Sequence, residues 1–201
     1  MTSDYAGSLA RYIESQAHPV DKFGHQPRLV ALTTAIGAGL EFDRDIVVAA
    51  AWLHDLGVFV GHRPEAPDQL AHWDHVAYAC KNAPQILREA GFPEEKIPAV
   101  LLAMREHQPG DEPTTMEATV LRDADILEQL GAIGVLRTVS KIGRDTRFPR
   151  FTDAVAVLRR NLHELPAKIR LDSTRRLAQP RIAILREFLR AVDDEGGSCL
   201  F

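Results

Sequence analysis

The chain has 201 residues, the size of one ordinary domain, and 45% of them are hydrophobic, which is enough to bury a core. Its formal net charge of −4 gives no broad basic surface, so we expect no nucleic acid partner. Two cysteines, Cys80 and Cys199, are too few for a disulfide framework. The chain begins without a signal-peptide pattern and has no apolar run long enough to span a membrane, so we expect a cytoplasmic protein with no membrane contact.

The hydrophobic spacing predicts an all-α fold, because helical periodicity recurs along the chain and no alternating strand pattern of useful length is present. Asp43 is a suitable N-cap, and Gly39, Gly57 and Gly91 are suitable helix ends. In chain order, the expected helices cover residues 4–17, 25–38, 44–56, 70–90, 94–107, 115–142 (as one helix or two), 152–165 and 172–193.

No low-complexity linker divides these helices, so we expect one domain over residues 1–201. Its core should cover about residues 23–143, followed by a C-terminal helical extension at residues 152–193. The last helix is most simply a packing helix, and it could also support a homodimer.

The chemistry begins in the helix expected at 44–56. This segment is apolar almost all round and therefore buried, yet it ends in the dipeptide His54-Asp55. A buried carboxylate is costly unless it is paired or coordinated, and a divalent transition metal ion (Mn, Fe, Co, Ni or Zn) accepts both imidazole nitrogen and carboxylate oxygen. The alternative is a His-Asp pair that only caps the end of the helix.

Two more residues favour a metal site. His25 begins the second expected helix, and Asp125 lies in the apolar segment Leu121–Glu128. The order of one His, a His-Asp pair and a distal Asp, each on a separate helix, resembles the HD-domain superfamily. The resemblance implies a metal ion held by His25, His54, Asp55 and Asp125, with His54 and Asp55 at the centre of catalysis.

The resemblance also selects Asp125 over Asp123, because the family's distal Asp usually sits in a segment such as Ala124-Asp125-Ile126-Leu127. The stretch from Asp123 to Thr138 is similar to one branch of predicted HD phosphohydrolases that act on nucleotides.

Further histidines raise the possibility of a second ion. Some HD proteins place two more histidines between the His-Asp pair and the final Asp, and His72 and His107 resemble these positions. His75, three residues after His72, is expected outside the ligand shell. The branch resemblance points the other way, because its members often lack these histidines, so one ion is expected and a second stays open.

Several cations could bind phosphate oxygens, above all Arg28, Lys141 and Arg144. Arg137, Lys141 and Arg144 share one helix face at spacings of four and three. Some HD phosphohydrolases carry an acidic general acid shortly after the His-Asp pair, but residues 56–60 are apolar here. The nearest acidic substitutes are Glu65, Asp68 and Asp74.

These observations predict a metal-dependent phosphohydrolase whose substrate is a small phosphomonoester or phosphoanhydride, with nucleotides first. Two alternatives remain at this point: a di-iron oxygenase built on six ligands, and a non-catalytic module that senses a nucleotide.

Overall fold

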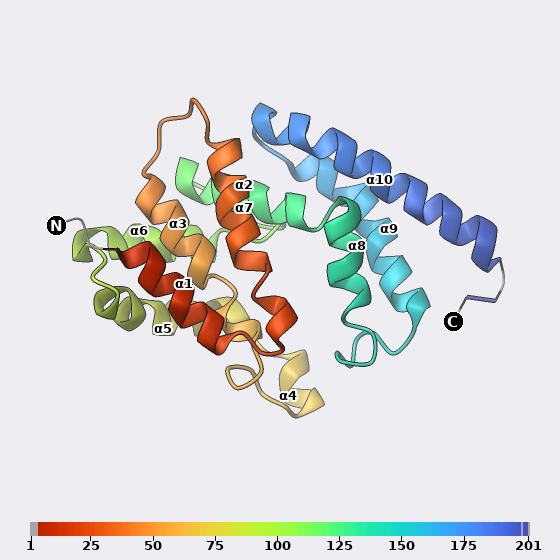
Figure 1. Ribbon diagram of the computed structural model, residues 1–201, viewed down its shortest axis with the longest axis horizontal. Helices are drawn as coiled ribbons and strands as arrows, with labels where there is room; N and C mark the ends of the chain where they lie inside the picture. Colours follow the sequence, from red (N-terminus) through yellow and green to blue (C-terminus); the bar gives the residue numbers. More distant parts are fainter. Residues whose placement is uncertain (1–3, 198, 201) are drawn as a thin grey trace. The chain divides into compact units, whose positions relative to one another are not determined.

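The computed structural model describes residues 4–197 and 199–200, and these residues form ten α-helices and three short 3-10 helices without a strand (Figure 1). The all-α prediction is therefore confirmed. The helices are α1 (Tyr5–Gln16), η1 (Val20–Lys22), α2 (His25–Ile36), α3 (Arg44–Leu53), η2 (Leu56–Val58), α4 (Pro67–Ala71), α5 (His75–Glu89), η3 (Glu94–Lys96), α6 (Ile97–Arg105), α7 (Met116–Glu128), α8 (Gly131–Val139), α9 (Phe151–Lys168) and α10 (Asp172–Gly196).

The chain divides into two compact units, residues 1–122 and 123–201, and the division falls within α7. The sequence predicted a core that continues to about residue 143, so the observed division comes earlier. The single-domain organisation stays a prediction.

The first unit is organised around α3. Seven of its ten residues are buried, and it packs against α1, α2, α5 and α6. Asp43 caps its start as predicted, since its carboxylate accepts the N–H of Asp45 at 3.0 Å. A helix that is apolar on every side suits this central position, and it carries the residue that follows it, His54, into the interior.

Several helix bounds differ from the prediction. Helix α2 ends at Ile36, and the expected end residue Gly39 has φ +81° in the turn beyond it. Helix α3 ends at Leu53 because Asp55 turns the chain into η2. The single helix expected at 70–90 is split into α4 and α5, because Asp74 acts as a new N-cap and accepts the N–H of Ala77 at 2.8 Å.

The second unit contains the end of α7 and the helices α8, α9 and α10, which pack against one another. Gly131 is the first residue of α8 and has φ +70°, a backbone conformation that is unfavourable for residues with a side chain. At Gly134 an added Cβ would lie 2.4 Å from the Gln129 carbonyl oxygen. These two glycines account for the break and the close turn between α7 and α8.

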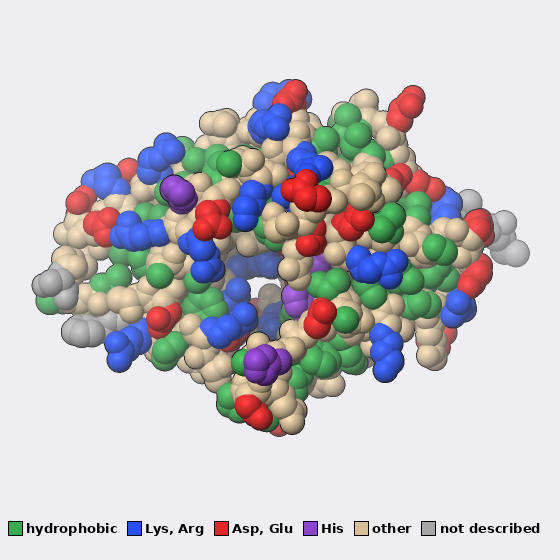
Figure 2. All heavy atoms as spheres, turned by 180° about the vertical axis from the view of Figure 1, so that it is seen from behind, with side chains coloured by type: hydrophobic (Ala, Val, Ile, Leu, Met, Phe, Trp, Pro, Cys, Tyr) green, Lys and Arg blue, Asp and Glu red, His purple; other side chains and the backbone are tan. Residues whose placement is uncertain are grey.

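Charged side chains of both signs are interspersed over the face drawn in Figure 2. None of the helices in the described part of the chain has the length and hydropathy that crossing a membrane requires.

Candidate metal centre

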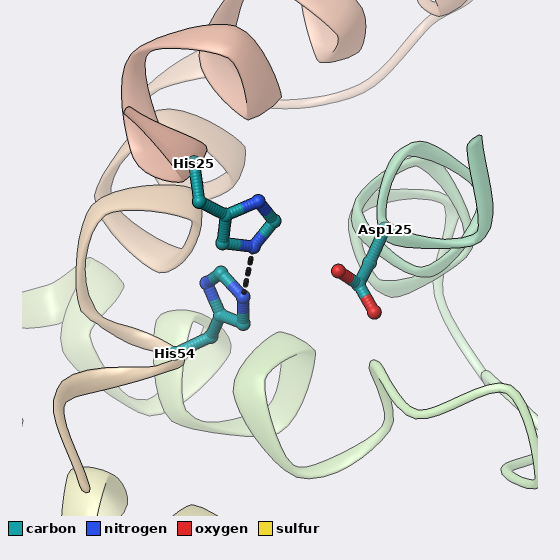
Figure 3. A group of neighbouring side chains, drawn as sticks. All are labelled: His25, His54 and Asp125. Carbon is teal, nitrogen blue, oxygen red and sulfur yellow. Dashed lines mark hydrogen bonds between the residues drawn. The ribbon is translucent and has the colours of Figure 1, made fainter. Parts of the chain in front are cut away.

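Two imidazoles meet in the interior of the first unit. His25 is the first residue of α2 and His54 follows the last residue of α3, and both are buried. Figure 3 shows the two rings pointing toward each other, with their Nε2 atoms 3.3 Å apart. The third side chain labelled there, Asp125, belongs to the second unit and is described with it below.

Backbone carbonyls orient two of the rings. The last carbonyls of a helix lack intrahelical partners, and a side-chain N–H can satisfy one of them. His54 Nδ1 lies 3.0 Å from the Ala51 carbonyl oxygen, and His107 Nδ1 lies 2.6 Å from that of Met104. Because a carbonyl oxygen only accepts, these contacts place the proton on Nδ1 and leave Nε2 with its lone pair, as metal binding requires.

Asp55 supplies a carboxylate to the same place. Its Oδ2 atom lies 3.6 Å from His25 Nε2 and 3.6 Å from His54 Nε2. Burial by itself would raise the pKa of the Asp55 carboxyl, but the positive charge of four neighbouring imidazoles in their protonated form, with those of His54 and His25 first, lowers this pKa below its usual range. Asp55 is therefore a carboxylate, the form that binds a cation.

Two further histidines lie in this part of the first unit. One ligand atom from each of His54, Asp55 and His107 lies within 4.8 Å of the other two. His75 Nε2 lies 3.8 Å from Asp55 Oδ1, and its ring is 6.4 Å from that of His107. His72 is exposed at the end of α4. Coordination by His72 or His107 and the exclusion of His75 stay predictions, but by position it is His75 that faces Asp55, where the sequence pointed to His72.

The position of His75 has a local cause. An added Cβ at Gly57 would lie 2.6 Å from the His75 carbonyl oxygen and 2.8 Å from its Cα atom, so only glycine allows this approach between η2 and the start of α5. Trp73 Nε1 donates to the Gly57 carbonyl oxygen at 2.8 Å and fastens the same junction. Sequence reasoning missed this contact, although Gly57 two residues after Asp55 and Trp73 two before His75 are its signals.

In the second unit, the two candidate aspartates of α7 have different surroundings. The carboxylate of Asp123 is fully buried and accepts the backbone N–H groups of Arg170, at 3.1 Å, and Leu171, at 2.9 Å. It thereby holds the connection between α9 and α10. The carboxylate of Asp125 accepts from Gln129 Nε2 at 2.9 Å and lies 3.9 Å from Arg137 Nη1. Asp123 therefore has a structural task, which agrees with the choice of Asp125 as the candidate ligand.

The predicted phosphate-binding cations have different degrees of exposure. Arg28 lies one turn after His25 on α2 and is partly buried. Lys141 and Arg144 follow α8 in the second unit and are exposed, and Lys141 Nζ lies 5.3 Å from the centre of the Phe148 ring. Their part in substrate binding stays a prediction.

None of the acidic substitutes for the missing general acid is buried. Glu65 and Asp68 are exposed, and Asp74 is engaged as the N-cap of α5. The structure therefore gives no reason to prefer any of them as a proton donor.

The donor set of the first unit fits a transition metal ion. Two nitrogen ligands at about 2.0–2.1 Å from one tetrahedral ion lie roughly 3.3 Å apart. The Nε2 atoms of His25 and His54 have this separation, and a carboxylate oxygen lies near both. Imidazole and carboxylate together suit the first-row divalent ions from Mn to Zn.

Comparisons with known proteins identify the fold. No curated protein sequence matches the chain. Among solved structures, Bacillus subtilis YpgQ is 23% identical, with a TM-score of 0.73 over 98% of this chain and 99% of YpgQ. YpgQ in complex with ADP is also 23% identical, with a TM-score of 0.72 over 97% of both chains. A predicted HD-superfamily hydrolase from an uncultured Thermotogales bacterium is 21% identical, with a TM-score of 0.63 over 98% of this chain and 93% of its own. At these identities the similarity establishes the fold.

The family follows from the sequence comparison. The HD domain model matches residues 23–130, more than half of the chain, and this range contains every candidate metal ligand from His25 to Asp125. The chain belongs to the HD domain family.

Proposed function

We propose that this protein is a metal-dependent phosphohydrolase, with one divalent transition metal ion held by His25, His54, Asp55 and Asp125. The observation that carries the proposal is the convergence of two buried Nε2 atoms, 3.3 Å apart, on the carboxylate of Asp55. A hydrogen-bonded cap at the end of α3 would need only His54, and it would not explain why the buried His25 and the partly buried carboxylate of Asp55 lie beside it.

The inclusion of Asp125 rests on three observations. The match to the HD domain model continues to residue 130 and so includes it. Helix α7, which carries Asp125, begins in the first unit at Met116 and continues past the division. Asp125 is also buried, and a carboxylate oxygen in the interior is a suitable ligand for a divalent transition metal ion.

When bound, the ion would supply Lewis acidity toward a phosphoryl oxygen and lower the pKa of a water molecule. The protein would supply orientation and charge. Asp55 Oδ2 faces His25 and His54, so we assign it to the ion, and we assign Oδ1 to accept a hydrogen bond from the attacking water. Arg28, Lys141 and Arg144 would offset the charge of the phosphate.

The substrate we propose is a small phosphomonoester or phosphoanhydride, with nucleotides first. YpgQ, which shares this fold, has been crystallised with ADP. The segment from Asp123 to Thr138 resembles the nucleotide-directed branch of the family, which supports the same substrate class.

The test is release of phosphate or pyrophosphate by the full chain from nucleoside mono-, di- and triphosphates and from sugar phosphates, with Mn²⁺ and after chelation. We expect His54→Ala and Asp55→Ala to lower the hydrolysis rate at least about 100-fold. Mutation of a residue that only hydrogen-bonds to a metal ligand already lowers metal affinity or activity about 10- to 100-fold. His163→Ala, an exposed histidine of the second unit, is the control. Equal rates with and without metal would contradict the proposal.

The same experiment separates the alternatives. Oxygen consumption that depends on iron, without phosphate release, would replace the hydrolase by the oxygenase. Tight nucleotide binding without turnover in any metal would replace it by the nucleotide-sensing module.

A further inference from the structure

Arg137 of α8 lies against two buried carboxylates of α7. Its Nη1 atom is 3.9 Å from Asp125 Oδ1 and 3.7 Å from Glu128 Oε2. The Glu128 side chain is 1% exposed and that of Asp125 12%. Residues three apart share a helix face, so both anionic side chains lie close to the guanidinium of Arg137.

The contacts of Arg137 are weaker than those of an arginine with a purely structural role. Neither carboxylate is within hydrogen-bond distance of Nη1, and within the described part of the chain Arg137 donates one hydrogen bond, to the Glu128 carbonyl oxygen at 3.5 Å. By contrast, Arg147 donates two hydrogen bonds to the Asp145 carboxylate, at 3.0 and 2.7 Å. Arg181 donates to the Leu127 carbonyl oxygen at 2.7 Å. Arg137 therefore lies near both carboxylates but forms no close hydrogen-bonded ion pair with either of them.

The guanidinium also has donors to spare. Among the described residues, its contacts run through Nη1, and 29% of the side chain is exposed. Arginine carries five N–H donors in a planar fork that matches the oxygens of a phosphate. Nε and Nη2 are therefore placed to meet a ligand beside Asp125.

We propose that Arg137 binds a phosphoryl oxygen of the substrate directly and so selects for phosphorylated ligands. This inference rests on the proposed function, in which Asp125 ligates the ion. A bound divalent ion offsets the charge of Asp125, which leaves the guanidinium paired with Glu128 alone. An anion held at that ion lies next to Asp125, where charge-assisted hydrogen bonds from Arg137 can reach it.

The test measures binding, not turnover. The full chain is loaded with one equivalent of Mn²⁺, the affinity for Mn²⁺ is followed by electron paramagnetic resonance, and inorganic phosphate is titrated by calorimetry. We expect Arg137→Gln to weaken phosphate binding by about 10- to 100-fold, the range for hydrogen bonds to a charged group. The phosphate affinity of Arg137→Lys should lie between those of the wild type and Arg137→Gln, since lysine keeps the charge but lacks the planar array of N–H donors. Arg160→Gln, an exposed arginine of α9, should leave the affinity unchanged.

A second variant separates binding from structure. Arg137→Gln removes the guanidinium that lies 3.7 Å from Glu128, whereas Arg137→Gln with Glu128→Gln removes both charges. If Arg137 binds phosphate, the double variant should bind phosphate as weakly as Arg137→Gln does. Its affinity for Mn²⁺ should be equal to or higher than that of Arg137→Gln. Recovery of phosphate affinity in the double variant, or no loss in Arg137→Gln, would overturn the inference. Failure of the wild-type chain to bind Mn²⁺ would instead overturn the proposed function.

Discussion

The two compact units differ in the ligands that they can bind. The first carries seven of the eight histidines, with 10 Lys and Arg against 17 Asp and Glu. The second carries one histidine, and 12 of its 14 cationic residues are arginines, against 11 Asp and Glu. Imidazoles and carboxylates bind cations, whereas guanidinium groups bind anions, so the side chains of the first unit favour a metal ion and those of the second favour an anion.

The placement of these side chains differs as well. His54 and His107 follow the ends of α3 and α6, where a carbonyl three residues earlier fixes the ring and leaves Nε2 available. The arginines of the second unit lie mostly on exposed helix faces, as Arg175 and Arg190 do, where they pair with nearby acids such as Asp172 and Glu187. Exposed pairs contribute little to stability, so a rarer contact such as that of Arg137 is the more informative one.

The largest expected effect sharpens the contrast within α7. Asp123→Ala leaves the N–H groups of Arg170 and Leu171 without their acceptor, which should lower the free energy of unfolding by about 2–4 kcal/mol. Asp125→Ala should leave stability nearly unchanged and abolish Mn²⁺ binding. Urea unfolding followed by far-UV circular dichroism, with metal analysis of both variants, checks this. Loss of metal in Asp123→Ala but not in Asp125→Ala would reverse the two assignments.

The next effect is metal-linked stability of the first unit. Both tryptophans, Trp52 and Trp73, lie in that unit, so their fluorescence reports its unfolding alone. At a free Mn²⁺ concentration about 100 times the Kd, binding should add about 2.7 kcal/mol and raise the melting temperature by roughly 5–10 °C.

The variant His25→Ala should remove this increase, whereas the exposed His18 offers a matched control in His18→Ala. An equal increase in both variants would mean that Mn²⁺ binds elsewhere.

A smaller effect decides between His75 and His72. His75 lies 3.8 Å from Asp55 Oδ1, while His72 is exposed. We expect His75→Ala to lower the hydrolysis rate about 10-fold, as for partners that surround a metal ligand, and His72→Ala to leave it unchanged. Metal analysis of His75→Ala and His107→Ala should show one ion in each. A fall from two ions to one in both would establish a second ion, and oxygen consumption should then be measured beside phosphate release.

The contrast between His72 and His75 also shows where sequence reasoning stops. The buried helix that ends in His54 and Asp55 could be predicted because its apolar pattern is local. The position of His75 could not, since it depends on the approach of Gly57 to the backbone of α5, a packing contact between segments 18 residues apart. The break between α4 and α5 was missed for a related reason, because the cap formed by Asp74 overrides an otherwise continuous helical pattern.

The choice between Asp123 and Asp125 needed the family resemblance, because both residues lie in the same apolar segment. The structure adds a physical reason, since Asp123 is held by two backbone N–H groups from a region 47 and 48 residues away. Nothing in the local sequence of Glu128 marks it as buried. Its exposure of 1% comes from the turn between α7 and α8 that Gly131 and Gly134 permit.

The smallest expected effect concerns pH and again separates the units. His62 of the first unit has Nδ1 3.0 Å from the Tyr78 hydroxyl and Nε2 2.9 Å from Gln16 Oε1, and burial lowers its pKa below the ordinary value. Protonation is then easier in the unfolded chain, where the pKa is about 6.5. The folded state is therefore destabilised progressively as the pH falls from about 6.5 toward the lower folded pKa, and it is unaffected above 6.5.

With metal chelated, the urea midpoint from tryptophan fluorescence should be lower at pH 5.5 than at pH 7.5. His62→Gln should reduce this difference, while His18→Gln should not. The change should be modest because the ring is partly exposed, and an undiminished pH dependence in His62→Gln would assign it to other groups.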